Sequence, residues 1–191
     1  MKKWECAIIC QIVICSLILF LPRTGAAFGY NPAKQFEKAN ITLPAPASTQ
    51  SEKYLGLDSM KPFKVSNIKA KVVVIEFMSA LCDYCSYNAR MMNEVYKMIQ
   101  ENPQLAPNAK VIAIGIGNSD AELNAFKEEH DVHYPMLNDA NGSIGTAMGN
   151  LRTPTILIVS TQTGKVLYCH VGLIWSSDWF VSKVEDLINK G

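Results

Sequence analysis

The distribution of apolar and polar residues along the chain predicts strands and helices in turn. The run from Lys71 to Met78 is rich in β-branched and other apolar residues, which is typical of a strand covered on both faces. A second run of this kind extends from Val111 to Ile116. Between the two runs, apolar residues recur at helical spacing from Asp83 to Glu101. A capping box at Ser119 then opens a helix that we expect to end near residue 130.

The second half of the chain predicts smaller elements and a closing helix. Thr155–Val159 and Val166–Val171 flank a short glycine-containing loop, so they predict an antiparallel hairpin. Ser177-Asp178 caps a helix with one apolar face. Before the hairpin we expect Tyr134 to Leu137 to be extended and Ser143 to Met148 to form a helical turn. The order β-α-β-α, then a hairpin, then α predicts an α/β fold with a mixed central sheet and helices on both faces.

The region ahead of the first long strand is expected to lie outside the core. Phe28 to about Lys53 is rich in proline and small residues, and each proline removes a backbone donor, so we interpret this stretch as a linker. Leu55-Gly56-Leu57 and Phe63-Lys64-Val65 predict a short hairpin or edge strands, which would form an N-terminal β extension. On this interpretation the domain proper spans residues 54–191.

The first residues have the pattern of a secretory signal peptide. Two lysines precede an apolar run from Ala7 to Leu21, and the small residues Gly25-Ala26-Ala27 follow, so we expect a signal peptide over residues 1–27. The run is shorter than the roughly 18 to 20 apolar residues that span a bilayer. An uncleaved anchor is the alternative, because Glu5 is unusual in a basic leading region. The pattern predicts a periplasmic or otherwise extracytoplasmic protein, which is membrane-anchored if the signal is retained.

Length and charge restrict the class of protein further. A chain of 191 residues, of which 49% are apolar, is long enough for one domain with a substantial core. The formal net charge is only +1, which argues against a nucleic-acid binder and against a charged disordered tail. No nucleic-acid partner is therefore expected.

The predicted export changes how the six cysteines are counted. Three of them fall in the signal segment, which leaves Cys82, Cys85 and Cys169 in the mature chain. In an oxidising compartment a close pair of cysteines can form a disulfide. We interpret Cys169 as a small buried residue in a strand and not as a third redox thiol.

Cys82 and Cys85 form a C-x-x-C motif where the first long strand gives way to a helix. The first cysteine of such a motif lies beside unpaired backbone N–H groups and the positive end of the helix dipole, which favour the thiolate. In these motifs the thiol pKa falls from about 8.5 to between about 3.5 and 7.5. We therefore predict that Cys82 is the nucleophile and that Cys85, one turn further on, resolves a mixed disulfide.

Glu76 is the other residue of this stretch with candidate chemistry. It lies six positions before Cys82 among Val, Ile, Phe and Met, where an unpaired carboxylate is costly to bury. A buried carboxyl with a raised pKa could accept the proton of Cys85 as that thiol becomes the attacking thiolate. The alternative is that Glu76 pairs with a lysine or faces water near a strand end. We expect the catalytic role.

The segment from Glu76 to Cys85 resembles the active site of thioredoxin-like proteins, in which an acidic residue six positions before the first cysteine is buried below the pair. Arg152-Thr153-Pro154-Thr155 and the apolar run after it resemble the cis-proline loop of that family and its following strand. Gly164-Lys165-Val166 and His170-Val171-Gly172 resemble its terminal hairpin. The resemblance spans about Tyr54 to Gly191, and the N-terminal extension is similar to that of the exported TlpA/ResA branch.

The resemblance implies that Pro154 is cis and lies against Cys82, and that Thr153 offers its backbone to a substrate strand. Two substrate-binding positions depart from the family: Leu81 stands where Trp is common, and Tyr84 stands where Pro is common. Residues beside the two cysteines tune the relative stability of thiolate and disulfide, so the direction of electron flow is left open.

The function implied is that of an extracytoplasmic thiol-disulfide oxidoreductase, which exchanges disulfides with protein substrates through its cysteine pair. That pair serves in place of a separate cofactor. The expected partners are the thiols or disulfides of exported proteins, and a membrane-bound redox donor or acceptor.

Two other functions compete with this one. A copper(I) chaperone of thioredoxin-like fold could use the two cysteines and a histidine. A thiol peroxidase usually has Pro and Thr ahead of its reactive cysteine, whereas this chain has Met78-Ser79-Ala80-Leu81 there. A structural zinc site is not expected, because one C-x-x-C provides two ligands where such sites use four, and no resident metal is predicted. The histidines of the chain are His130, His133 and His170.

Overall fold

A computed structural model describes residues 30–149 and 151–190. The chain divides into Met1–Tyr30 and Asn31–Gly191, and the elements below all belong to the second unit. The predicted signal peptide, residues 1–27, lies outside the described residues. Within the described ranges, no helix combines the length and the apolar character needed to cross a membrane.

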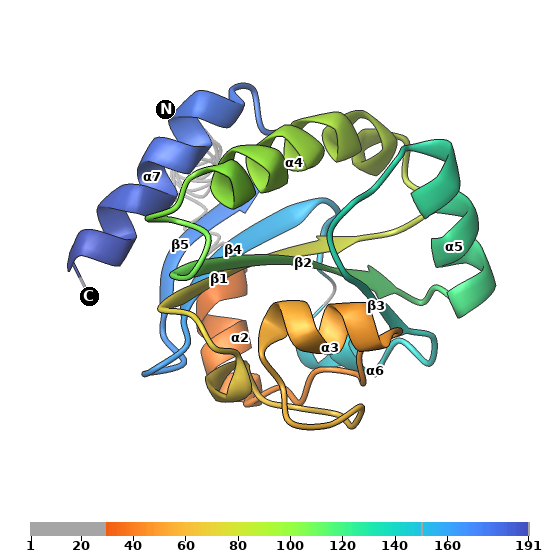
Figure 1. Ribbon diagram of the computed structural model, residues 1–191. Helices are drawn as coiled ribbons and strands as arrows, with labels where there is room; N and C mark the ends of the chain where they lie inside the picture. The colour runs from red at the N-terminus through yellow and green to blue at the C-terminus, as the bar shows by residue number, and fades with distance from the viewer. Residues whose placement is uncertain (1–29, 150, 191) are drawn as a thin grey trace, which may run out of the picture. The chain divides into compact units, whose positions relative to one another are not determined.

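Five strands form one sheet at the centre of this unit (Figure 1). They are β1 (Val72–Met78), β2 (Ala109–Ile116), β3 (Met136–Asp139), β4 (Thr155–Ser160) and β5 (Val166–Val171). Their order in the sheet is β3-β2-β1-β4-β5. β1 pairs in parallel with β2, and β2 with β3, whereas β4 is antiparallel to both β1 and β5. The mixed sheet of an α/β fold was predicted from the order of elements and is confirmed.

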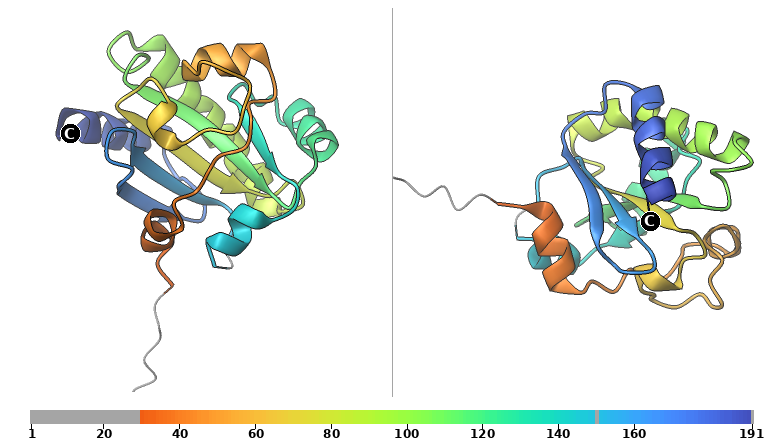
Figure 2. Two further views of the ribbon diagram at one scale, coloured as in Figure 1. Left: turned by 90° about the horizontal axis from the view of Figure 1, so that it is seen from below. Right: turned by 90° about the vertical axis from the view of Figure 1, so that its left-hand side faces the viewer.

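Helices cover both faces of this sheet (Figures 1 and 2). One face packs against α4 (Asp83–Glu101), α5 (Asp120–Glu129) and α7 (Ser177–Lys190). The other face packs against α2 (Pro32–Ala39), α3 (Thr49–Leu55) and α6 (Ser143–Ala147), with a short 3-10 turn at Val65–Asn67.

The central strand β1 contributes to both layers of core. All of its residues are buried, and successive side chains of a strand point to opposite faces of the sheet. Val74 and Met78 join the cluster under α4 and α7, while Ile75 and Phe77 join the cluster over α2 and α3. By this alternation Glu76 lies on the α4 face, below the cysteine motif.

The elements predicted from residue 71 onward are confirmed, with small shifts at their ends. The helices at 83–101 and 120–129 and the strands β1, β2, β4 and β5 match the predicted segments. β3 begins at Met136, two positions later than expected, so Tyr134 lies just ahead of the strand.

The prediction of a linker over Phe28 to Lys53 is wrong for the described part of that stretch. Pro32 stands in the first turn of α2, behind an Asn31 cap whose side chain accepts the amide of Lys34 at 3.1 Å. A proline there fits the helix, because its missing N–H would be unpaired in any case. Ser48 caps α3 in the same way. Both helices add buried side chains to the core, so the domain begins well before residue 54.

The predicted N-terminal β extension is also wrong. Leu55 ends α3, and Gly56 follows in the left-handed conformation (φ +69°), which closes the helix. Phe63 forms only an isolated antiparallel bridge with Leu43, through N–O contacts of 2.7 and 3.0 Å. The sheet edge at β5 is covered instead by α2, whose Glu37 accepts the amide of Val166 at 2.8 Å (Figure 2).

Candidate active site

The C-x-x-C motif lies where β1 meets α4. β1 ends at Met78, a short loop follows, and Cys82 is the N-cap of α4 with extended backbone (φ −106°, ψ 113°). Its amide donates to the carbonyl of Ser79 at 3.1 Å, and its carbonyl accepts the amide of Cys85 at 2.9 Å. The backbone amides of Tyr84 and Cys85 lie beside the Cys82 sulfur, which is the placement predicted for a helix N-terminus.

A buried asparagine fixes the loop ahead of Cys82. The side-chain Oδ1 of Asn118, between β2 and α5, accepts the amide of Ala80 at 2.9 Å, and Asn118 itself is buried. Asn118 follows Gly117, whose φ of +68° favours glycine. Sequence reasoning missed this residue. The available signal was a glycine-asparagine pair directly after a buried strand.

The two thiols of the motif differ in exposure and in proton affinity. Burial acts to raise the pKa of Cys82. Hydrogen bonds with the Thr153 and Cys85 side chains and with backbone amides act against burial and outweigh it, so the net pKa of Cys82 is lower than that of an ordinary thiol. Cys85 is 1% exposed, and burial raises its pKa, with the neighbouring Cys82 and Glu76 adding to the rise. Cys82 is therefore suited to act as a thiolate, while Cys85 stays a thiol until a base removes its proton.

Glu76 is buried on the α4 face of β1, only 2% exposed. Burial raises its pKa from the ordinary 4.5 to about 7, although hydrogen bonds from Asn88 and Tyr134 oppose that rise. The alternatives of a lysine partner or a solvent-facing position are not observed, because among the described residues Glu76 forms no ion pair. A carboxyl with a pKa near 7 exchanges its proton readily at neutral pH.

Asn88 and Tyr134 are the hydrogen-bond donors to Glu76. Asn88 Nδ2 donates to Glu76 Oε1 at 2.7 Å, and the Tyr134 hydroxyl donates to Oε2 at 3.2 Å. Sequence reasoning identified neither residue. Asn88 carried a signal, since it is a polar residue one turn after Cys85 on the apolar face of a helix. Tyr134 carried none, because a tyrosine near a short strand reads as packing.

Thr153 and Pro154 reach the motif from the loop before β4. The Thr153–Pro154 peptide bond is cis in the structure. The Cys82 thiol lies 3.5 Å from the carbonyl oxygen of Thr153, so this loop forms one wall of the site. Pro154 is buried, and its carbonyl accepts the amide of Gly172 at 2.9 Å.

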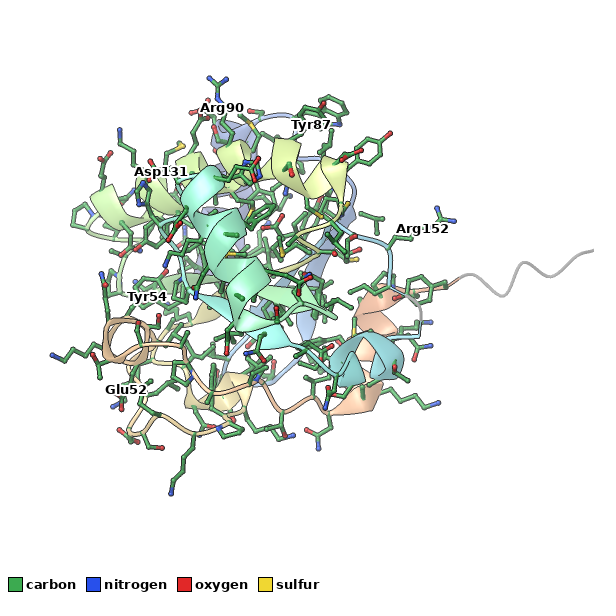
Figure 3. The ribbon with its side chains drawn as sticks, turned by 90° about the vertical axis from the view of Figure 1, so that its right-hand side faces the viewer. Glu52, Tyr54, Tyr87, Arg90, Asp131 and Arg152 are labelled. Carbon is green, nitrogen blue, oxygen red and sulfur yellow. The ribbon has the colours of Figure 1, made fainter. Side chains whose placement is uncertain are left out.

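Leu81 and Tyr84, the two departures from the family pattern, flank Cys82 on the outside. Leu81 is 83% exposed and Tyr84 is 63% exposed, so neither contributes to the core. Tyr87 continues the same side of α4 and points away from the sheet (Figure 3). The exposed surface beside the nucleophile thus carries apolar and aromatic side chains, together with the exposed carboxylate of Asp83.

The histidines and the third cysteine lie apart from this pair. Within the described ranges, no group of three or more His, Cys, Asp or Glu is placed to hold a metal ion. The His170 ring contacts the carbonyl of Leu173 at 2.8 Å, and His133 pairs with Asp131. Cys169, half-buried on β5, packs against the core on the α2 face of the sheet, opposite the face of Cys85.

Comparison with known proteins places the chain in a family. Residues 39–169 match the profile of the AhpC/TSA family, which is well over half of the chain. The protein belongs to the AhpC/TSA family. A thiol-disulfide oxidoreductase ResA of Bacillus thuringiensis subsp. konkukian is 25% identical over 107 residues, 56% of this chain and 58% of that protein. The ResA protein of Geobacillus thermodenitrificans is 24% identical over 180 residues, 93% of this chain and 94% of that one.

This AhpC/TSA family member also has the fold of solved redox proteins. A secreted Mycobacterium tuberculosis disulfide oxidoreductase homologous to DsbE matches it with a TM-score of 0.56 and 17% identity, over 78% of this chain and 98% of that structure. At this identity the likeness shows the fold, which is the thioredoxin-like one that the sequence resemblance implied. The chain matches little more than half the length of the Bacillus relative and nearly all of the Geobacillus one.

Proposed function

We propose that this family member is a thiol-disulfide oxidoreductase that exchanges disulfides with protein substrates through Cys82 and Cys85. The observation that carries the proposal is the contrast between the two sulfurs. Cys82 is accessible at the N-terminus of α4 with a lowered pKa, and Cys85 is buried behind it next to a carboxyl. The relatives named ResA, one of which is matched over nearly its whole length, support the same activity.

In the first step the Cys82 thiolate attacks one sulfur of a substrate disulfide. A mixed disulfide forms between Cys82 and the substrate, and the other substrate sulfur leaves as a thiolate that takes a proton from solvent. The hydrogen bonds to Cys82, including those from the first amides of α4, lower its pKa and so favour the thiolate that makes this attack.

In the second step Cys85 gives its proton to the carboxylate of Glu76 and attacks the Cys82 sulfur. The bond between Cys82 and the substrate breaks, the Cys82–Cys85 disulfide forms, and the second substrate sulfur leaves. Two protein thiols are oxidised while one substrate disulfide is reduced. The reverse sequence gives a disulfide to the substrate, so the redox state of the partners decides the direction.

The proposed substrate contacts are the backbone of Thr153, the adjoining Pro154, and the exposed side chains of Leu81 and Tyr84. Their position around the Cys82 sulfur supports this role. An extracytoplasmic location, with exported proteins as substrates and a membrane-bound redox partner, is part of the proposal. It is supported by the signal-like pattern of residues 1–27 and by the secreted relative of the same fold.

A trapping experiment tests the proposal. Cys85→Ser keeps the nucleophile and removes the resolving thiol, so incubation with insulin should leave a stable mixed disulfide on Cys82, detected by mass spectrometry. Cys82→Ser is the matched control and should trap nothing. The wild-type protein should reduce insulin disulfides and equilibrate with glutathione at a defined potential. Tight stoichiometric copper(I) binding with little exchange would point to a chaperone instead, and consumption of peroxide by the reduced protein would point to a peroxidase.

A further inference from the structure

Each oxygen of the Glu76 carboxyl has its own buried donor. Asn88 Nδ2 donates to Oε1 at 2.7 Å, and the hydroxyl of Tyr134 donates to Oε2 at 3.2 Å. Both donors are 1% exposed, so water does not compete for these bonds. The carboxyl is therefore held from two sides, by α4 and by the segment ahead of β3.

The orientation of Asn88 is set by a third contact. Its Oδ1 accepts the amide of Ile174 at 2.9 Å, in the loop between β5 and α7. Because Oδ1 is used by a donor, the amide nitrogen must face Glu76, and it can only donate there. Asn88 thus offers Glu76 a hydrogen bond that cannot reverse its direction.

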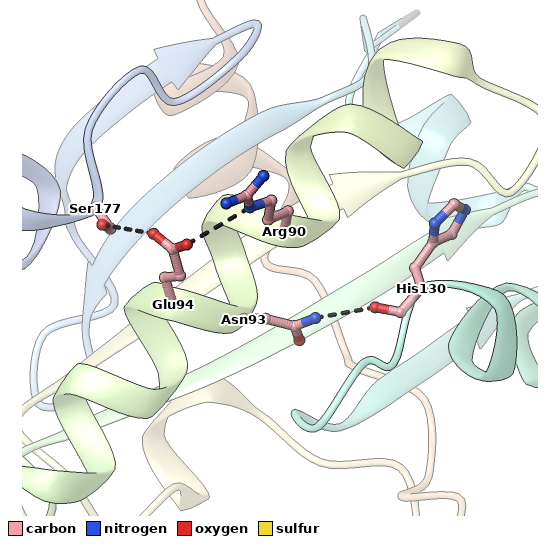
Figure 4. Close-up of polar contacts among 5 residues, drawn as sticks. All are labelled: Arg90, Asn93, Glu94, His130 and Ser177. Atoms are coloured by element: carbon pink, nitrogen blue, oxygen red, sulfur yellow. Dashed lines mark hydrogen bonds and ion pairs between the residues drawn. The ribbon is translucent and has the colours of Figure 1, made fainter.

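Helix α4 also anchors the two segments that contact Asn88 and Glu76 (Figure 4). Asn93 donates to the carbonyl of His130 at 3.0 Å and accepts the amide of His133 at 3.3 Å, which fixes the segment leading into Tyr134. Glu94 accepts the hydroxyl of Ser177 at 3.1 Å, which fixes the start of α7 after the Ile174 loop. α4 therefore carries both cysteines and also anchors the surroundings of Glu76.

We propose that Asn88 and Tyr134 are positioning residues for proton transfer from Cys85 to Glu76, and that their hydrogen bonds favour the ionised carboxyl in the resting enzyme, which is the form that can take that proton. This inference rests on the proposed function. Hydrogen bonds donated to the charged form of an acid favour that form. Burial favours the protonated form of Glu76, which cannot accept a proton, and the two donors oppose that effect.

The other groups around Glu76 do not replace Asn88 and Tyr134 as donors that favour its ionised form. The titratable groups that interact with it are Cys85 on α4 and Tyr134 ahead of β3. Its cross-strand neighbours on β2 and β4, Ala113 and Ile156, are apolar. The buried residues of α7, which packs over this face, are uncharged.

The test is the pH dependence of the second step. A mixed disulfide between Cys82 and glutathione is prepared, and release of glutathione is followed in a single turnover from about pH 5.5 to about pH 9. Tyr134→Phe removes one donor and keeps the ring, so the acid limb of the profile should move to higher pH. For a shift of about one pH unit, release at pH 7 slows roughly five-fold and the difference closes near pH 9. Tyr96→Phe is the matched control, because its ring lies 6.1 Å from that of Tyr134 but its hydroxyl does not bond Glu76, and its profile should not move.

Asn88→Leu should also move the pH profile of glutathione release to higher pH. NMR titration of the Glu76 carboxyl carbon in each folded variant measures the midpoint of the Glu76 titration without any turnover. An equal slowing at every pH with an unmoved midpoint would mean that Tyr134 only packs, and would overturn the inference. An unmoved carboxyl titration in both variants would overturn it as well. In either case the wild-type protein would still exchange disulfides, so the proposed function would stand. A wild-type protein that exchanged no disulfides would overturn the proposed function and this inference together.

Discussion

The carbonyl oxygen of Thr153 lies 3.5 Å from the Cys82 sulfur, although 71 positions separate the two residues. The register of the sheet explains this contact. β1 and β4 are antiparallel neighbours with Phe77 opposite Thr155, so the loop after β1 lies beside the loop before β4. A polypeptide paired with the Thr153 backbone would therefore be held next to the nucleophile, which is the arrangement that disulfide exchange with a protein requires.

Tyr84→Pro should make the cysteine pair more reducing. The backbone amide of Tyr84 is one of the groups that lower the pKa of Cys82, and a proline has no amide hydrogen to donate. Tyr84 lies in the first turn of α4, where a proline is tolerated, so the fold should be kept. Losing this donor should raise the pKa of Cys82 and weaken the reduced form relative to the disulfide. Alkylation of Cys82 against pH and equilibration with glutathione measure the two effects.

Tyr84→Ala is the control for that prediction, because it removes the exposed ring and keeps the amide. We expect it to leave the alkylation midpoint and the reduction potential close to those of the wild type. Equal shifts in the two variants would show that the side chain of Tyr84, and not its amide, sets the properties of Cys82.

Glu76→Gln should stabilise the folded protein at high pH relative to the wild type. The pKa of Glu76 is raised from 4.5 to about 7, so the folded state binds this proton more tightly than the unfolded chain. The stabilisation from this group is fully present below about pH 4.5 and is lost as the pH rises through about 7. Glutamine does not titrate, so the difference in unfolding free energy should change by about 3 kcal/mol in favour of the variant between pH 4.5 and pH 8. Urea unfolding of the reduced proteins at several pH values measures this, and a difference that stays constant with pH would contradict a buried, titrating Glu76.

The parts of the fold with a clear period could be predicted from the sequence. A strand buried on both faces, such as β1, leaves a continuous apolar run, whereas a helix buried on one face, such as α4, leaves apolar residues at helical spacing. The boundary between these two patterns places Cys82 and Cys85 correctly. The burial of Glu76 follows from its apolar neighbours in the strand. Local pattern was therefore enough to locate the cysteine pair and the carboxyl below it.

What the sequence could not supply depends on contacts between distant segments. Asn118, Asn88 and Tyr134 act on residues 12 to 58 positions away, and only the folded sheet brings them together. The proline-rich stretch was misread for a different reason. A proline weakens the interior of a helix but favours its first turn, and composition does not tell the two positions apart, so α2 was missed.

Leu43→Ala should destabilise the whole domain, although it lies in the stretch first interpreted as a linker. Leu43 is fully buried in the core cluster on the α2 face of the sheet. Truncating a buried leucine typically costs about 2 to 5 kcal/mol. Thr42→Ala, at the exposed neighbouring position, is the control and should cost less than about 0.5 kcal/mol. Equilibrium unfolding in urea compares the two, and equal effects would mean that this stretch is not part of the cooperative unit.

Asn118→Ala should disturb the loop that presents Cys82. The variant leaves the part-buried amide of Ala80 without its acceptor; a fully buried unpaired donor costs about 1 to 3 kcal/mol, so we expect a loss toward the low end of that range. Because this loop leads directly into the N-cap of α4, we expect slower alkylation of Cys82 as well as a lower unfolding free energy. Asn118→Asp retains an oxygen in the same place, so it should recover most of the alkylation rate at a pH where the carboxyl is ionised. If Asn118→Ala lowered stability and left the reactivity of Cys82 unchanged, Asn118 would support the fold without positioning the nucleophile.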